Sequence, residues 1–168
     1  MAKAISNSSP LIHLAAIGRL RLLQDFYEGV LIPPAVWREV VEEGKGRPGA
    51  SEVGHAAKQG WLQITHIADR ALVQLLRRDL DDGEAEAIAL AVEQTPDVIL
   101  LDESEARTVA KTFGLCKTGT IGVLVRAKQR GMITSLRDEL ERLQTDASFW
   151  ISEQLHRQVL DAVDELTS

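Results

Sequence analysis

The sequence has a single cysteine, Cys116, so an internal disulfide framework is excluded. It has no apolar run near the roughly 20 residues that a membrane-spanning helix needs, which excludes a spanning segment. No charged and apolar leader precedes the polar stretch at residues 6–9. These absences predict a cytoplasmic protein without a membrane partner. A chain of 168 residues is long enough for one domain with a substantial core.

The motifs of several common chemistries are also missing. The segment at residues 114–120 lacks the P-loop spacing, and no GxGxxG follows the first predicted strand. Cys116 has no neighbouring histidine in the sequence, so we expect a buried core residue rather than a nucleophile. HExxH is absent and no histidine pair has metal-ligand spacing, which argues against a zinc hydrolase. The four histidines are His13, His55, His66 and His156.

The sequence lacks a basic excess as well. The net charge of −6 speaks weakly against nucleic acid as a partner, because sequence-independent affinity for phosphate comes from Lys and Arg. The charge is uneven, however, and residues 104–137 contain seven basic side chains against one acid, Glu105. This run is either a solvated helix surface or one basic face on an acidic protein. The seven are Arg107, Lys111, Lys117, Arg126, Lys128, Arg130 and Arg137.

What the chain does have is an alternation of short apolar runs with longer helical patterns, undivided by a linker or an internal repeat. This alternation predicts an α/β fold with a central parallel sheet of four to five strands. Strands are predicted at residues 3–6, 30–32, 62–67 and 97–101, with a weaker one at 115–117. Helices should begin near Pro10, at Pro34 and at Asp82 or Gly83, and should cover residues 104–113, 120–130, 135–144 and 152–166.

Polar residues follow two of the predicted strands. Asp102 and Glu103 come directly after the apolar run at residues 98–101, at the carboxyl end of a strand, where open α/β sheets bind ligands. Asn7, with the serines at 8 and 9, follows the first strand, where these residues could instead simply cap a helix.

Further acids lie on helices beside these strands. Glu39 lies in the helix that follows the second strand, and taken alone it is expected to be an ordinary side chain in contact with water. Glu84 and Glu86 open the helix before the fourth strand, where acids also favour the helix dipole. A pair of carboxylates at 4 Å repels by about 4 kcal/mol at an effective dielectric of 20, so a cluster holds a cation or shifts its pKa values. Oxygen-only ligands favour Mg²⁺ or Mn²⁺.

Five segments, taken in order, resemble the PIN-domain superfamily, specifically a PIN-like group of predicted nucleic-acid-binding proteins. The segments are AISNSSPLI, VLIPPAVWREVVEEG, LDDGEAEAIALAVE, ILLDESEARTVAKTFGL and TGTIGVLVRAKQRGMI. The resemblance implies a three-layer α/β/α sandwich and a PIN-like domain over residues 1–135. Residues 136–168 carry no matching motif, and we expect a C-terminal helical extension packed on the same domain or on a partner.

The resemblance also implies a function. PIN domains are known to bind Mg²⁺ or Mn²⁺ and to cleave RNA, often as toxins paired with antitoxins, and they are commonly dimers. The four acids of the family pattern fall on Asn7, Glu39, Glu84 and Asp102. Glu86 is the alternative for the third position, and Glu103 is an extra acid beside the fourth. Small hydroxyl residues of the family site could correspond to Ser8, Ser9, Thr118 or Thr120.

Roles follow from this assignment. The metal ligands would be Glu39, Glu84, Asp102 and Glu103, with Asn7 a weak ligand or an orienting group. The RNA backbone would be held by basic side chains of two predicted helices, namely Arg107, Lys111, Arg126, Lys128 and Arg130.

The amide at Asn7 stands where the family usually has a carboxylate, so metal affinity should fall. The leading hypothesis is a metal-dependent ribonuclease of PIN type. The alternative is a degenerate PIN fold that binds nucleic acid or protein with little nuclease activity. A third hypothesis is an unrelated phosphohydrolase that uses Asp102.

Overall fold

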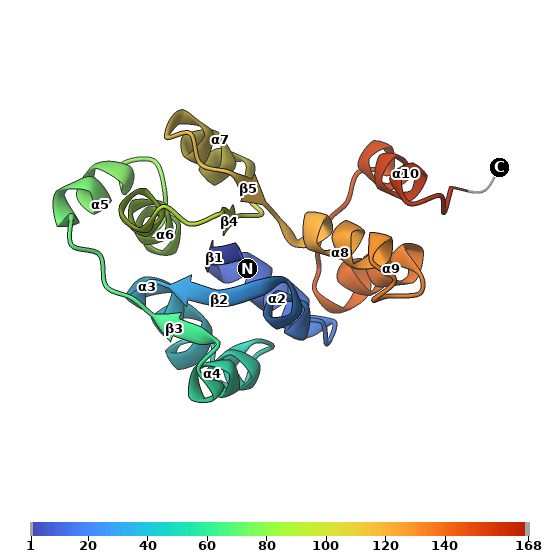
Figure 1. The fold of residues 1–168 in the computed structure, drawn as a ribbon, viewed down its shortest axis with the longest axis horizontal. Coiled ribbons are helices and arrows are strands. Elements are labelled where there is room, and N and C mark those ends of the chain that lie inside the picture. The colour runs from blue at the N-terminus through green and yellow to red at the C-terminus, as the bar shows by residue number, and fades with distance from the viewer. Residues whose placement is uncertain (1, 167–168) are drawn as a thin grey trace.

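The protein is built on a parallel five-stranded sheet, seen in a computed structural model that describes residues 2–166 (Figure 1). The strand order is β3-β2-β1-β4-β5, and each neighbouring pair is parallel. The strands are β1 (Ala2–Ser6), β2 (Tyr27–Ile32), β3 (Leu62–Ile64), β4 (Val98–Leu100) and β5 (Lys117–Thr118). Helices cover both faces of the sheet, which confirms the predicted three-layer α/β/α fold.

The central strands are buried on both faces, and alternate residues feed two separate cores. Ala4 and Ile5 are neighbours in β1 and are both fully buried. Ala4 belongs to the core beneath one helical layer, whereas Ile5 belongs to the core beneath the other. This is the behaviour of a strand with period-two side chains in the middle of a covered parallel sheet, and it explains why these strands read as continuous apolar runs.

The larger core contains side chains from the first two helices and from helices late in the chain, and the smaller one is built mainly around residues 67–110. The elements between β1 and β3 are α1 (Ser8–Ala16), α2 (Arg21–Phe26), α3 (Pro34–Trp37), the π-helical turn η1 (Arg38–Glu42) and α4 (Ala50–Gln59). The remaining helices are α5 (Arg70–Leu76), α6 (Asp82–Gln94), α7 (Ser104–Thr112), α8 (Thr120–Gln129), α9 (Leu136–Asp146) and α10 (Glu153–Ala162).

Most of the predicted elements are present, with shifted ends. The helix expected from Pro34 does start there, but it changes to a π-helical turn and ends at Glu42. The last helix ends at Ala162, well before residue 166, and Asp164 has a left-handed backbone with φ 59°. The sequence patterns predict no helix in the segments that form α2, α4 and α5, so these three helices are found only in the structure.

Cys116 corrects a prediction, because its side chain is exposed rather than buried in the core. The residue immediately precedes β5, the strand at one edge of the sheet, and its carbonyl accepts a hydrogen bond from the Ile99 amide at 2.9 Å. Backbone pairing therefore holds Cys116 at the sheet edge without requiring its thiol to enter the core.

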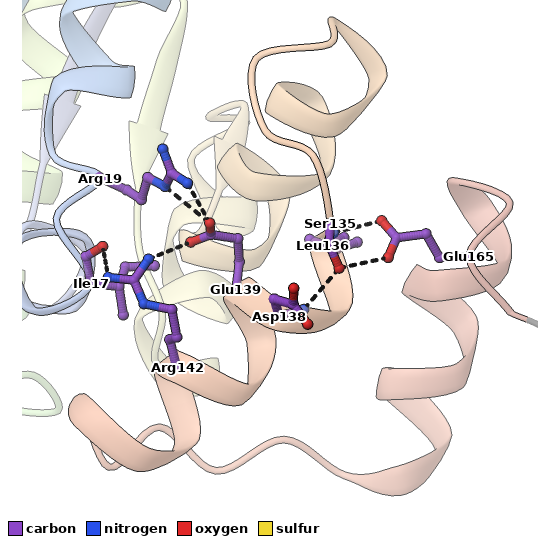
Figure 2. Close-up of polar contacts among 8 residues, drawn as sticks. All are labelled: Ile17, Arg19, Ser135, Leu136, Asp138, Glu139, Arg142 and Glu165. Carbon is purple, nitrogen blue, oxygen red and sulfur yellow. Dashed lines mark hydrogen bonds and ion pairs between the residues drawn. The ribbon is translucent and has the colours of Figure 1, made fainter.

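The segment after residue 135 docks onto the first helices through a buried carboxylate. Glu139 on α9 is 5% exposed, and it accepts hydrogen bonds from Arg19 and Arg142 (Figure 2). Arg142 also donates to the Ile17 carbonyl at 2.6 Å. Leu136, together with the leucines at 140 and 143, joins the larger core, so α9 is part of the same packed unit as β1 and β2.

Glu165 explains why the chain turns back after α10. Its carboxylate accepts hydrogen bonds from the amides of Leu136 and Arg137, at 2.6 and 3.1 Å, and from the Ser135 hydroxyl (Figure 2). These amides belong to the first turn of α9 and have no partner within that helix. The carboxylate thus satisfies them from outside, and these hydrogen bonds lower the pKa of Glu165 against the opposing effect of its burial. Within residues 2–166, no helix is long and apolar enough to span a membrane.

Replacing Glu139 should therefore loosen the contact between α9 and the first helices. We expect Glu139→Ala to lower the free energy of unfolding by about 2 kcal/mol, less than for a fully buried pair because the arginines keep some contact with water. Urea denaturation would measure the change. Glu141→Ala, an exposed position on the same helix, should change stability by less than about 0.5 kcal/mol. Equal losses in the two variants would contradict the buried ion pair as a source of stability.

Candidate active site

The candidate site lies where β1 and β4 end side by side. Ser6 pairs with Leu100 in parallel register, and the Asn7 amide donates to the Leu100 carbonyl at 3.1 Å. Asn7 and Asp102 therefore leave the sheet at the same edge, although they are far apart in the sequence. This is the carboxyl edge, the ligand-binding edge of open α/β sheets.

Asn7 does not cap the helix that follows it. It occupies the N-cap position of α1, but its side chain makes no capping hydrogen bond. Asn7 is 4% exposed and Ser8 is 2% exposed. The oxygens Asn7 Oδ1 and Ser8 Oγ are buried without a hydrogen-bond partner within residues 2–166. Buried polar oxygens are rarely left unsatisfied, so this pair needs a functional explanation.

A third oxygen comes close to these two around Gly83, in the first turn of α6. A Cβ built on Gly83 would lie 3.1 Å from Asn7 Oδ1, 3.2 Å from Glu39 Oε2 and 3.5 Å from Ser8 Oγ. Glu39 is exposed as a whole residue, but its carboxylate thus approaches the buried oxygens. We call Asn7, Ser8, Glu39 and Gly83 the oxygen cradle, because the glycine leaves open a space that three oxygen atoms approach.

Asp102 forms a second cluster at the same edge. Its Oδ1 accepts from the Thr120 amide at 2.7 Å, and its Oδ2 accepts from the Thr120 hydroxyl at 2.7 Å. His13 Nδ1, on α1, lies 2.7 Å from Oδ2 and donates to it. Gly119 permits this approach, because a Cβ there would lie 2.7 Å from Oδ1. A carboxylate has about four acceptor positions, so three are used and one on Oδ1 stays open.

The two glutamates that open α6 have different roles. Glu84 is 8% exposed, and its carboxylate accepts from the Asp81 amide at 3.1 Å in a capping box. Glu86 points to another helix, where it accepts from the Ala35 amide at 3.0 Å and pairs with Arg70 at 3.4 Å. Glu86 is thus occupied in supporting the start of α3.

Glu103 links the two strand ends. Its Oε1 accepts a hydrogen bond from the Ser9 hydroxyl at 2.9 Å, and the residue is otherwise exposed. Ser9 is in the first turn of α1, next to Asn7 and Ser8, whereas Glu103 is next to Asp102 after β4. This hydrogen bond therefore connects the oxygen cradle with the Asp102 cluster.

The acids carry uncompensated negative charge. Burial is the main cause that raises the pKa of Glu39. The Ser8 hydroxyl, which approaches this carboxylate without meeting hydrogen-bond geometry, opposes the shift, and the charges of Asp81, Glu43 and Glu103 add to it. Burial likewise raises the pKa of Glu84; the Asp81 amide opposes the shift, and Asp81 and Glu103 again add to it. Because burial is the larger cause, these raised pKa values show mainly that both carboxylates are partly desolvated, and the like charges of Asp81 and Glu103 are the smaller part that a cation would offset.

The oxygen atoms that could bind a metal ion at this site are of different chemical kinds. No three His, Cys, Asp or Glu side chains in the described part of the chain lie close enough together to hold a metal ion. The oxygen cradle instead combines one carboxylate with an amide oxygen and a hydroxyl. Mg²⁺ takes oxygen ligands, commonly one or two carboxylates with several waters, and neutral protein oxygens can serve as well. The unsatisfied oxygens therefore fit a hard divalent cation.

The basic residues expected to hold RNA do not all lie here. Arg107 is beside Asp102, where it donates to the Leu101 carbonyl at 3.2 Å, and Lys111 is exposed one turn further along α7. Thr120, the partner of Asp102, is the first residue of α8. The basic residues at 126, 128 and 130 lie roughly 9 to 15 Å from it along the helix axis, and so away from Asp102. There Arg126 and Arg130 stack over the ring of Phe26, and Lys128 binds Glu165 and the Thr134 carbonyl.

His13 was missed by the sequence reasoning, which considered histidines only as members of metal-binding spacings. A usable signal did exist, because Ser9 and His13 are four residues apart and so share one face of α1. That face meets Asp102 and Glu103, through one hydrogen bond each. Gly83 and Gly119 were missed too, since their importance lies in the contacts that a side chain would disturb.

The fold and the site together define a class of protein: a three-layer α/β/α module with oxygen donors gathered at the carboxyl edge of a parallel sheet. A family model described as the PIN domain matches residues 3–165, so the chain belongs to the PIN domain family. PIN domains are nuclease-type modules that generally use divalent metals. No curated protein matches the chain.

The raised pKa of Glu39 makes a prediction about pH and stability. The folded state holds the Glu39 proton more tightly than the unfolded chain does, so ionisation weakens the fold. This penalty is absent below the ordinary pKa of 4.5 and develops as the pH rises through the raised value. Urea denaturation should therefore find Glu39→Gln more stable than the wild type at pH 7, and equally stable at pH 4.

Glu42→Gln is the matched control, because Glu42 is exposed in the same helical segment. It should track the wild type at both pH values. A Glu39→Gln variant that is less stable than the wild type at pH 7 would contradict the proposed burial of this charge.

Proposed function

We propose that the protein is a metal-dependent ribonuclease of PIN type that hydrolyses RNA phosphodiesters with Mg²⁺ or Mn²⁺. The observation that carries the proposal is the oxygen cradle, where two buried oxygens have no partner within residues 2–166 and face a carboxylate across Gly83. A ribonuclease of this kind needs oxygen ligands that the substrate can reach, and Glu39 and Gly83 of the cradle line a surface hollow.

The direct ligands in this proposal are Glu39, Asn7 and Ser8, with Asp102 contributing the one free position on its Oδ1. Glu84 and Glu103 act through their charge and through bound water. When bound, a divalent ion lowers the pKa of a coordinated water and neutralises charge on the phosphate. The amide at Asn7 supplies a neutral oxygen, so the cradle carries less negative charge than an all-carboxylate set.

The chain's own residues set the geometry. Thr120 donates hydrogen bonds to both carboxylate oxygens of Asp102, one from its amide and one from its hydroxyl. His13 on α1 donates a further hydrogen bond to Oδ2. Asp102 is therefore a preorganised acceptor, with a side chain that is 5% exposed. Arg107 lies next to it and is positioned to bind a phosphate of the substrate.

Cleavage of a mixed-sequence single-stranded RNA tests the function. With Mn²⁺ or Mg²⁺, the wild type should cleave, EDTA should stop it, and Glu39→Gln or Asp102→Asn should each lower the rate by about 100-fold. Glu105→Gln is the control, because Glu105 is an exposed acid on α7 outside both clusters. Variants that cleave like the wild type would refute this placement of the chemistry.

The second candidate is a degenerate PIN fold that binds RNA or protein without efficient cleavage. The observation that favours it is Asn7 itself, an uncharged group at the centre of the site. Metal-independent RNA binding by a folded wild type that does not cleave would select this candidate. A role as the toxin of a toxin–antitoxin pair, and a homodimer, are expectations that rest on the family resemblance alone.

Asn7→Asp separates the two candidates. The added carboxylate should tighten Mn²⁺ binding about tenfold or more, because it faces the cation at short range. In a nuclease the rate at limiting metal should rise with it, whereas a repurposed scaffold should gain metal affinity without cleavage. Isothermal titration and the RNA assay measure the two effects.

The same substitution should destabilise the metal-free protein, since it adds a buried charge to an acidic cluster. Gln74→Glu, which adds a carboxylate at an exposed position on α5, is the control and should leave Mn²⁺ affinity unchanged. If Asn7→Asp binds Mn²⁺ no better than the control does, Asn7 does not face a metal site.

A further inference from the structure

A groove of about 640 Å³ runs from Asp102 to the segment that leads into α10. Its lining has two chemically different parts. Phe149, Trp150 and Leu155 supply an apolar part from the segment around the start of α10, while Arg107 and Lys117 supply positive charge from α7 and β5. Figure 1 shows α10 at the periphery of the molecule, beside α8 and α9 rather than against the sheet.

Trp150 is held outward by its neighbours. Its side chain is 82% exposed, more than any other large apolar side chain of the described residues. On one side of it, the ring of Phe149 packs edge-on against His13 at a centroid distance of 4.8 Å. On the other side, Ile151 is 5% exposed and belongs to the larger core. Because both neighbours are anchored, Trp150 is presented to the groove from a fixed backbone.

The charged part of the lining is available to a ligand. Arg107 uses one nitrogen to bind the Leu101 carbonyl, and it makes no other side-chain hydrogen bond within residues 2–166. Lys117 has no ion-pair partner in that same stretch. Asp102, the one acid in the lining, already accepts three hydrogen bonds. The groove therefore favours an anionic ligand at Arg107 and Lys117.

We infer that this groove binds a single-stranded segment of nucleic acid, with a base stacked on Trp150 and the adjoining phosphates on Arg107 and Lys117. Stacking on an exposed aromatic ring next to basic side chains is how proteins bind single strands without reading their sequence. A base in a duplex has no free face to offer, so the groove selects an unpaired strand. An apolar helix of a partner protein would leave both basic groups without complementary charge.

The groove also connects Trp150 with the candidate active site, because Asp102 is part of its lining. A nucleotide stacked on Trp150 would be followed by a phosphodiester close to the candidate active site. Trp150 is thus a positioning residue, which acts by holding the substrate and not by touching the reacting atoms. The inference rests on the proposed function, since it names the substrate form that this site would receive.

Binding without cleavage tests it. The probe is a fluorescein-labelled eight-nucleotide single-stranded RNA in EDTA, with affinity measured by fluorescence anisotropy. Trp150→Ala should weaken binding about tenfold or more, and Trp150→Phe, which keeps an aromatic face, should weaken it much less. Trp61→Phe is the control, because Trp61 immediately precedes β3 and does not line the groove. A duplex of the same length should bind equally to the wild type and to Trp150→Ala.

The salt dependence separates stacking from charge. Trp150→Ala should leave the slope of log K against log salt unchanged, whereas Lys117→Gln should reduce it by about 0.7, the contribution of one phosphate contact to a single strand. Wild type that does not bind single-stranded RNA, or Trp150→Ala that binds it as tightly as the wild type, would overturn the inference. So would Trp150→Ala that only dissociates a dimer in light scattering, which would make this face a protein interface.

The two proposals can fail separately. Binding that depends on Trp150, in a protein that cleaves no RNA with any added metal, would support the groove and refute the nuclease. Metal-dependent cleavage with affinity that does not depend on Trp150 would support the nuclease and refute the groove.

Discussion

The parallel pairing of β1 with β4 is the constraint on which the rest of the site depends. It places Ser6 opposite Leu100, so Asn7 and Asp102 emerge together from a sheet that is buried on both faces. The helices that follow these strands then start at the same edge, and α1 brings Ser9 and His13 to Glu103 and Asp102. A shift of this pairing by one residue would turn every side chain of the strand to the opposite face.

The two halves of the edge are built in opposite ways. The Asp102 carboxylate accepts three short hydrogen bonds, whereas the oxygens of Asn7 and Ser8 are buried and unsatisfied within the described chain. Leaving such groups unpaired costs free energy, which a bound cation would recover. The pKa of Glu39 is raised mainly by burial and further by neighbouring acids, and a bound cation would offset both effects. Together these features favour a site that is completed by a ligand.

Sequence patterns found the sheet because β1, β2 and β4 contain short apolar runs, whereas the edge strand β5 (Lys117–Thr118) overlaps its predicted range only at Lys117. They also placed the start of α3 at Pro34, and of α6 at Asp82 or Gly83, where the structure has Asp82. They did not reveal α2 and α5, which have six and seven residues and too few turns for a clear period. The site was only partly predictable for a related reason. The role of Gly83 depends on atoms brought in by β1 and η1, and the hydrogen bond of His13 to Asp102 depends on how α1 packs.

The central claim is that the oxygen cradle holds a divalent cation, and Mn²⁺ titration of Gly83→Ala by calorimetry tests it most directly. The added Cβ would lie 3.1 to 3.2 Å from two of the proposed ligand oxygens, while alanine itself suits a helix. Gly54→Ala, whose Cβ would meet nothing within 4 Å, is the matched control on α4. The account predicts that Gly83→Ala stays folded and loses Mn²⁺ affinity by about tenfold or more, with Gly54→Ala unaffected. Unchanged Mn²⁺ affinity in Gly83→Ala would contradict it.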